Sequence, residues 1–213
     1  MLNVTTNMKY FLIITFTVIS ISAFGQSESG DVSQCFEQFK KAVAEGNGKE
    51  ASEIVAPETI EHYQSLLNLA LEGDSIEVAS LRLIDKLVVI SMRNQLSKED
   101  ILQMDGKNFI AYAVDHGMLS KNSLINFQLG EIRVTDEFTI AQIIVGEMET
   151  PLKIHFYDQG GWRLDITPVL PEMSTSLKKT IDIAGMSEEE FILMTVQSFS
   201  GRSIGENIWF PMK

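Results

Sequence analysis

The spacing of apolar residues changes twice along this chain, and this change constrains the fold more than any other feature. From Asp31 to about Leu119 the apolar residues recur at helical spacing. From Phe127 to Ile166 they alternate with polar residues, as in strands that bury one face. Beyond Pro171 the helical spacing returns. The order of helices, then antiparallel strands, then helices predicts an α+β fold.

The helical part carries recognisable start signals. Asp31 is a predicted N-cap, and Pro57 suits the first turn of a helix, where its missing N–H costs nothing. The run Ser97-Lys98-Glu99-Asp100 resembles a capping box. One long helix is expected to open at Asp74 or Ser75 and to continue to Met92. A stripe of apolar residues predicts the buried face of the first helix: Val32, Cys35, Phe36, Phe39 and Val43.

Two runs at residues 127–134 and 138–145 predict the first pair of strands. The turn residues Thr135-Asp136-Glu137 separate them. Gly130 interrupts the alternation of the first run, which predicts a β-bulge there.

The clearest strand signal is a pair of alternating runs on either side of a turn. Apolar residues occupy the even positions of both runs: Leu152, Ile154, Phe156, Trp162, Leu164 and Ile166. A three-residue loop of Asp158-Gln159-Gly160 pairs position 156 with 162, 154 with 164 and 152 with 166. This register directs the even positions to the core. It places His155 beside Arg163 and Lys153 beside Asp165 on the opposite face.

The opening segment FEQFKKAVAEGN and the strand pair FYDQGGWRLDI together resemble the nuclear-transport-factor-2-like superfamily, which includes ketosteroid isomerase. The resemblance covers roughly residues 31–167. It implies N-terminal helices packed on a curved antiparallel sheet, a cone-like domain with an internal pocket. Members of the superfamily include isomerases, dehydratases, transport factors and accessory domains without catalysis. We expect this domain to span residues 26–170, with 171–213 as a C-terminal helical extension packed on it.

The first 25 residues have the pattern of an export signal. Lys9 precedes the uncharged run Tyr10–Phe24, and Ala23-Phe24-Gly25 resembles a cleavage site that cuts before Gln26. The run is shorter than the roughly 20 residues that span a bilayer, so no stable membrane anchor is expected after removal. The predicted location is periplasmic or secreted. The single cysteine, Cys35, cannot form an internal disulfide and is expected to be a buried small hydrophobe.

Composition and motifs exclude several classes of function. The formal net charge is −12, and removal of Lys9 with the signal makes it −13, which argues against binding to nucleic acid. The three histidines lie far apart, and no spacing typical of a metal site or nucleotide loop occurs. We therefore expect no metal and no cofactor.

Two sets of residues are candidates for a site. An isomerase-like reaction needs a carboxylate base beside a hydrogen-bond donor, and Asp165 with Tyr112 or Tyr63 is the nearest arrangement. The predicted register instead turns Asp165 into an exposed pair with Lys153, and His62 is expected to be solvated. A binding site for an apolar ligand is the second candidate, lined by Tyr112, Phe156 and Trp162. Core packing is the alternative role of these three rings.

The leading hypothesis is an exported, non-catalytic domain that binds a hydrophobic small molecule or a protein partner. One alternative is a metal-independent pocket enzyme of the isomerase or dehydratase type. The other is a structural homodimer that uses its sheet face as an interface.

Overall fold

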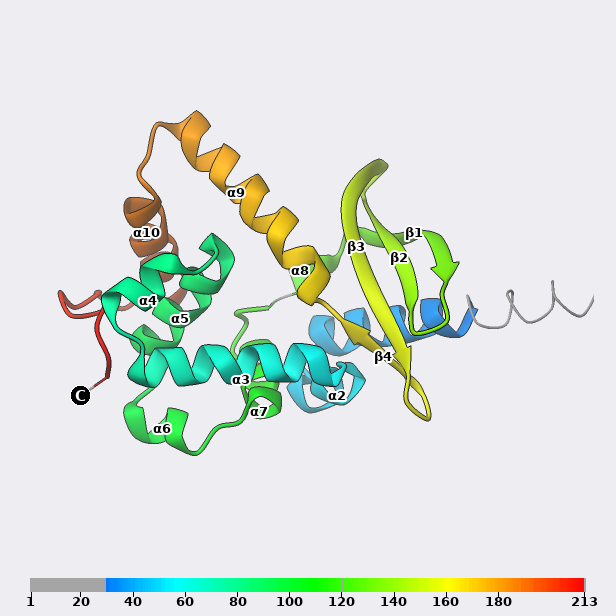
Figure 1. The fold of residues 1–213 in the computed structure, drawn as a ribbon, viewed down its shortest axis with the longest axis horizontal. Helices are drawn as coiled ribbons and strands as arrows, with labels where there is room; N and C mark the ends of the chain where they lie inside the picture. Colours follow the sequence, from blue (N-terminus) through cyan, green and yellow to red (C-terminus); the bar gives the residue numbers. More distant parts are fainter. Residues whose placement is uncertain (1–29, 120, 213) are drawn as a thin grey trace, which may run out of the picture.

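The computed structural model describes residues 30–119 and 121–212, which form an α+β fold (Figure 1). The predicted fold class is therefore confirmed, whereas the cone-like curvature stays a prediction. The predicted export signal lies outside the described residues. Within those residues, no helix combines the length and the apolar character needed to cross a bilayer.

Within the described residues, helices both precede and follow the sheet. The opening helix is described over residues 30–45. It is followed by α2 (Gly48–Ile54), α3 (Pro57–Glu72), α4 (Ser75–Ser80), α5 (Leu83–Gln95), α6 (Lys98–Leu102), α7 (Gly106–Asp115) and α8 (Lys121–Leu124). After the sheet come the short 3-10 helix η1 (Thr167–Val169), α9 (Leu170–Ala184) and α10 (Glu188–Ser200). Figure 1 places the sheet at one end of the molecule and α4, α5 and α10 at the other.

Local signals place most of these helices correctly. The side chains of Asp105 and Ser97 accept hydrogen bonds from the backbone of the first turns of α7 and α6. Ser187 and Glu190 form a capping box at α10, and Pro57 is the first residue of α3. The single long helix expected from Ser75 to Met92 is wrong, because the chain is extended at Leu81 and Arg82 and so separates α4 from α5.

Four antiparallel strands form one sheet in the order β1-β2-β3-β4. Their bounds are β1 (Phe127–Val134), β2 (Thr139–Val145), β3 (Met148–Asp158) and β4 (Trp162–Asp165). The register of β1 against β2 shifts between Leu129 and Ile132, which confirms the predicted bulge near Gly130.

The predicted register of the β3–β4 hairpin is wrong by two residues. Phe156 lies opposite Leu164 rather than Trp162, and Asp158 pairs with Trp162. The loop is therefore Gln159-Gly160-Gly161, whose two glycines have φ values of 74° and 145°. Only glycine adopts such angles without strain, so both glycines belong in the loop. Because a shift of two keeps the pleat, the even positions still face the core.

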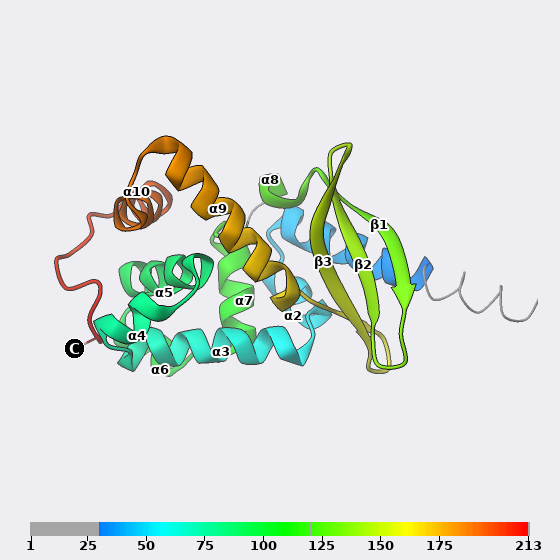
Figure 2. The same ribbon diagram turned by 45° about the horizontal axis from the view of Figure 1, so that its top comes forward.

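One apolar core lies between the sheet and the helices next to it. Buried residues of the opening helix, including Phe36 and Phe39, pack with Ile154, Phe156 and Leu164 of the sheet. Figure 2 shows the opening helix running along the sheet. Cys35 is buried in this core, as predicted, and burial raises the pKa of its thiol to about 11.

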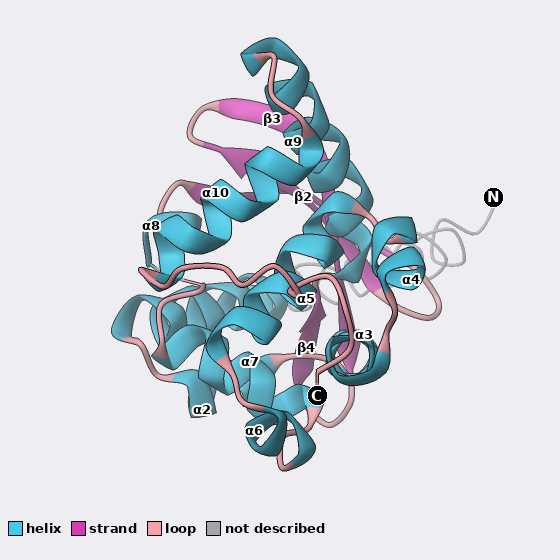
Figure 3. Ribbon diagram, turned by 90° about the vertical axis from the view of Figure 1, so that its left-hand side faces the viewer, coloured by secondary structure: helices cyan, strands magenta, loops and turns pink. Residues whose placement is uncertain are grey.

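A second apolar core lies among the helices away from the sheet. It is built from residues of α3, α5, α7, α9 and α10, with Leu67, Ile90 and Ile192 among those almost without exposure. Ile208 and Trp209 also pack against it, so this part of the C-terminal segment lies on the body of the molecule. Figure 3 views this end, where the C-terminal loop crosses in front of α5.

Candidate functional site

Asp165 lies buried at the end of β4, so the predicted exposed ion pair with Lys153 is wrong. Its carboxylate accepts hydrogen bonds from Thr59 Oγ1 at 2.8 Å, from the Thr167 backbone N–H at 2.9 Å and from Thr167 Oγ1 at 3.0 Å. Lys153 is opposite Gln142 instead. Three of about four acceptor positions of this carboxylate are thus occupied by the protein itself.

Thr59 explains the burial of Asp165. Thr59 is fully buried in the first turn of α3, and its Oγ1 also accepts a hydrogen bond from the Ile166 N–H at 3.0 Å. The pair of residues therefore fastens the start of α3 to the end of β4. These hydrogen bonds are typical of a carboxylate that stabilises the fold. A general base would instead face a substrate.

His155 lies opposite Asp165, not beside Arg163 as predicted. Its ring stacks on Phe138, with centroids 4.3 Å apart, and Phe138 also contacts the ring of Tyr157. Burial lowers the pKa of His155, and the charges of Asp165 and Lys153 act in opposite directions. Among the described residues, no tyrosine hydroxyl donates to His155 or Asp165, which an isomerase-like site would need.

The three predicted ligand-binding residues fall in two different cores. Phe156 is fully buried in the core under the sheet, and Trp162 packs at its margin. Tyr112 packs against the second core, where its ring stacks on His116 with centroids 3.8 Å apart. The structure thus brings Phe156 and Trp162 into one core and leaves Tyr112 in the other. Their ligand-binding role stays a prediction.

His62 is not the solvated residue expected from the sequence. Its Nε2 lies 3.0 Å from Asp85, which also accepts a hydrogen bond from Arg82 Nε at 2.7 Å. Burial raises the pKa of Asp85, but the hydrogen bonds and charges of His62 and Arg82 outweigh it, so the pKa is lowered. Asp85 is in the first turn of α5, where it links the start of this helix to α3.

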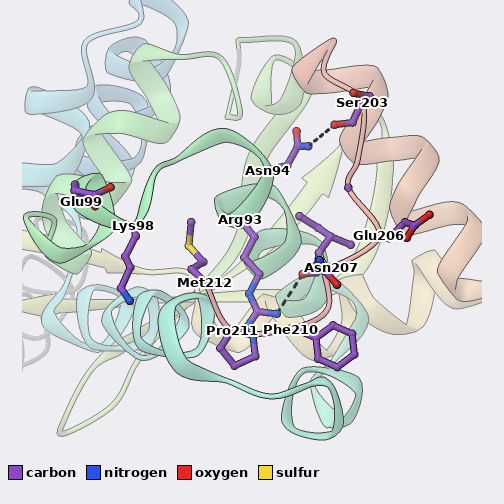
Figure 4. Close-up of a pocket in the computed structure, with 12 residues that line it drawn as sticks. Arg93, Asn94, Lys98, Glu99, Ser203, Glu206, Asn207, Phe210, Pro211 and Met212 are labelled. Carbon is purple, nitrogen blue, oxygen red and sulfur yellow. Dashed lines mark hydrogen bonds between the residues drawn. The ribbon is translucent and has the colours of Figure 1, made fainter.

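A hollow lies between α5, α6 and the C-terminal segment, residues 203–212 (Figure 4). We call it the C-terminal hollow; its volume is about 910 Å³. Four of the twelve residues that line it are apolar, and they form one wall: Ile208, Phe210, Pro211 and Met212. A second, smaller hollow of about 320 Å³ is lined by Lys86 and Glu188, which form an ion pair with each other.

Hydrogen bonds from α5 hold the C-terminal segment in place. Arg93 donates from Nη1 to the Ile208 carbonyl at 3.2 Å, and Asn94 donates from Nδ2 to the Ser203 carbonyl at 3.4 Å. At the far end, the Met212 N–H donates to the Leu71 carbonyl at 3.1 Å. The wall of the hollow is therefore fixed at both ends.

Arg93 is the central polar residue of the hollow. It is 8% exposed and also donates to the carbonyls of Leu69, Ala70 and Gly73 at the end of α3. No carboxylate pairs with it in the described part of the chain. Burial lowers its pKa. The guanidinium thus closes the C-terminal end of α3 and keeps its charge next to the hollow.

Sequence reasoning did not find this hollow. Arg93 and Asn94 are about 110 positions away from the segment that they hold, and no local motif marks such a contact. The apolar run Ile208-Trp209-Phe210 indicates that this end of the chain is packed, but it does not indicate which segment it packs against.

Among residues 30–119 and 121–212, no group of three or more histidine, cysteine, aspartate or glutamate side chains is arranged to hold a metal ion. A scan against protein-family models, a search of curated proteins and a search of solved structures each found no match for the chain.

Proposed function

We propose that this chain is an exported, non-catalytic domain that binds a hydrophobic small molecule in the C-terminal hollow. The observation that carries the proposal is the hollow of about 910 Å³ with its apolar wall. Ligand pockets are typically concave, about 300–1,000 Å³ in volume and largely apolar, with a few polar groups that orient the ligand. The pattern of residues 8–26 supports the exported location.

The surroundings of Asp165 favour binding over catalysis. A general base must reach the proton of a substrate, but the carboxylate of Asp165 is occupied by Thr59 and Thr167. The two hollows described above are lined by other residues than Asp165 and His155. An isomerase or dehydratase built on these two residues is therefore the weaker proposal.

The test is binding of Nile red, a neutral apolar probe, to the purified protein. We expect its fluorescence to rise on binding and the rise to be largely lost in Phe210→Ser, because this change removes apolar surface from the wall. Phe210 is 51% exposed, so the variant is expected to fold. Phe199→Ser is the matched control, since Phe199 is 71% exposed on α10 and does not line the hollow.

Equal Nile red binding by wild type and both variants would contradict the assignment of this hollow. No binding by the wild type would contradict the proposed function itself. Native mass spectrometry of the purified protein adds a second measurement, because a retained ligand would appear as a fixed additional mass.

The sheet supports a second candidate function, a homodimer. Phe138, His155 and Tyr157 form a half-buried group of rings on the face of the sheet that points away from the first core. Aromatic residues that are partly accessible at a surface are enriched at interfaces between proteins. Light scattering of wild type and Tyr157→Asp tests this candidate: a dimer in the wild type that dissociates in the variant supports it, and a monomeric wild type excludes it.

A further inference from the structure

Asn47-Gly48 is the one place in the sequence where an asparagine directly precedes a glycine. In such a pair the backbone nitrogen of the glycine can attack the side-chain amide carbon of the asparagine, because a glycine has no side chain that hinders the approach. Asparagine is among the thermally labile residues for this reason. Asn47 is exposed, so water reaches its side chain, whereas Gly48 is buried.

The fold requires both residues of this pair. A Cβ atom placed on Gly48 would overlap the carbonyl oxygen of Ala111 in α7, so only glycine fits there. The side chain of Asn47 makes two hydrogen bonds with Glu50: its Oδ1 accepts from the Glu50 N–H at 3.2 Å, and its Nδ2 donates to Glu50 Oε2 at 2.8 Å. A chemically labile pair is thus the consequence of two separate packing needs.

Asp115, the last residue of α7, holds the group that would react. The Gly48 N–H donates to Asp115 Oδ1 at 2.6 Å. The attack on Asn47 requires the Gly48 nitrogen to lose its proton. A hydrogen bond to a carboxylate keeps the proton in place, and the negative charge beside it disfavours an anionic nitrogen. A carboxylate is also far too weak a base to take a proton from a backbone amide.

We infer that Asn47 is a site of spontaneous deamidation whose rate is set by the hydrogen bond between Gly48 and Asp115. When this bond opens, the Gly48 nitrogen loses its proton and bonds to Asn47 Cγ. The bond from Cγ to Nδ2 breaks, and the amide nitrogen leaves as ammonia with the proton that Gly48 lost. Water then opens the five-membered imide at either of its carbonyls, which gives aspartate or isoaspartate.

Either product disturbs the contact between α2 and α7. A carboxylate at position 47 would face the Glu50 carboxylate, so repulsion replaces the present hydrogen bond. Isoaspartate also adds one carbon to the main chain directly before Gly48, where the backbone of Ala111 leaves no room. The modification is therefore expected to be a one-way change in this part of the fold. None of these residues lines the C-terminal hollow, so the inference is independent of the proposed function.

The test is incubation of the purified full chain at mildly alkaline pH, followed by digestion with trypsin. The tryptic peptide 42–49 contains Asn47 as its sole asparagine or glutamine, so mass spectrometry assigns the modification to this residue. We expect Asp115→Ala to deamidate about tenfold faster than the wild type, because a hydrogen bond to a charged group contributes free energy of this order. Asp182→Ala, at an exposed position of α9, is the matched control and should keep the rate of the wild type.

Two further comparisons keep the test decisive. Asp115→Asn retains an acceptor oxygen without the charge, and its rate is expected to lie between those of the wild type and Asp115→Ala. In urea all the variants should deamidate equally fast and faster than the folded wild type, because the effect of Asp115 depends on the fold. Circular dichroism shows which variants are folded, and if Asp115→Ala is not, the comparison of Asp115→Asn with the wild type decides.

Equal rates for the folded wild type and the folded Asp115 variants would overturn the inference. A wild type that deamidates as fast in its folded state as in urea would also overturn it, as would a difference between the variants that persists in urea. The proposed function is tested separately by Nile red binding.

Discussion

Asp165 joins three segments of the chain at one carboxylate. It holds Thr59 of α3 and Thr167 of η1, and it does so at the end of β4, where the sheet gives way to the C-terminal helices. A buried carboxylate is tolerated only when donors replace the water that it has lost. Asp165 therefore links the sheet to α3 through its hydrogen bond with Thr59.

The first prediction concerns the hydrogen bonds that the Asp165 carboxylate accepts. Asp165→Asn replaces one carboxylate oxygen by an NH₂ group that cannot accept from Thr59 or Thr167, so the free energy of unfolding is expected to fall by about 1–3 kcal/mol. Urea denaturation followed by circular dichroism measures it. Asp182→Asn, at an exposed position of α9, is expected to change the value by less than about 0.5 kcal/mol. Equal effects of the two substitutions would refute the structural role of Asp165.

A second prediction follows from the lowered pKa of His155. Because the folded state binds the proton less readily than the unfolded state, whose histidine pKa is about 6.5, stability is lost as the pH falls from about 6.5 through the folded pKa. We expect a smaller loss between pH 7.5 and pH 5 in His155→Gln than in the wild type. Urea denaturation at several pH values measures this difference.

His116→Gln is the control for that experiment. His116 lies exposed at the end of α7, so this variant retains His155 and is expected to keep the decline of the wild type. If His155→Gln shows the same decline as the wild type, the burial of His155 does not contribute to the pH dependence.

At the level of single residues, the sequence predicted which face a side chain takes but not what covers it. The alternation between 152 and 166 correctly assigned the even positions to the core. The burial of Asp165 and His155 depends on α3 and Phe138, which lie on other segments. Tertiary packing brings together the segments that bury these side chains, so a local sequence pattern does not reveal them.

At the level of elements, close approach of the backbone determines how α7 lies against α3. Gly106 begins α7, and a Cβ atom placed on it would be 2.1 Å from the Ile60 carbonyl oxygen and 2.8 Å from the Gln64 nitrogen. The Gly106 N–H also donates to Gln64 Oε1 at 3.0 Å. The two helices therefore meet where only glycine fits.

The third prediction is that Gly106→Ala destabilises the protein by about 1–3 kcal/mol or more, since the backbone of one helix must move to admit the methyl group. Thermal and urea denaturation both measure this. Gly205→Ala is the matched control, because nothing lies within 4 Å of a Cβ atom at Gly205 and its effect should stay within about 0.5 kcal/mol. A neutral Gly106→Ala would contradict the close contact of α3 and α7.

Helix starts that are marked by local capping residues could be predicted from the sequence. Helix boundaries that depend on contacts with distant segments could not. Capping residues such as Ser97, Asp105 and Ser187 mark helix starts because their hydrogen bonds are made within one turn. The break between α4 and α5 has no such marker. It is accompanied by the contacts of Asp85 with Arg82 and with His62 of α3, which only the assembled helices bring together.

At the level of the whole molecule, the described residues form two separate apolar cores. One joins the opening helix to the sheet, and the other joins α3, α5, α9 and α10. The α+β order was visible from the periodicity of the sequence alone. The C-terminal hollow was not, because it forms only where residues 203–212 return to α5 and α6.

If the C-terminal hollow is the binding site, a bound ligand must change the surroundings of the residues that line it. The most direct test is a titration of the ¹⁵N-labelled full chain with Nile red, followed by amide chemical shifts. We expect saturable shifts at residues 93–99 and 203–212, with the sheet residues 139–158 unchanged. Shifts concentrated around Phe156 and Trp162, or no saturable shifts at any position, would contradict this assignment.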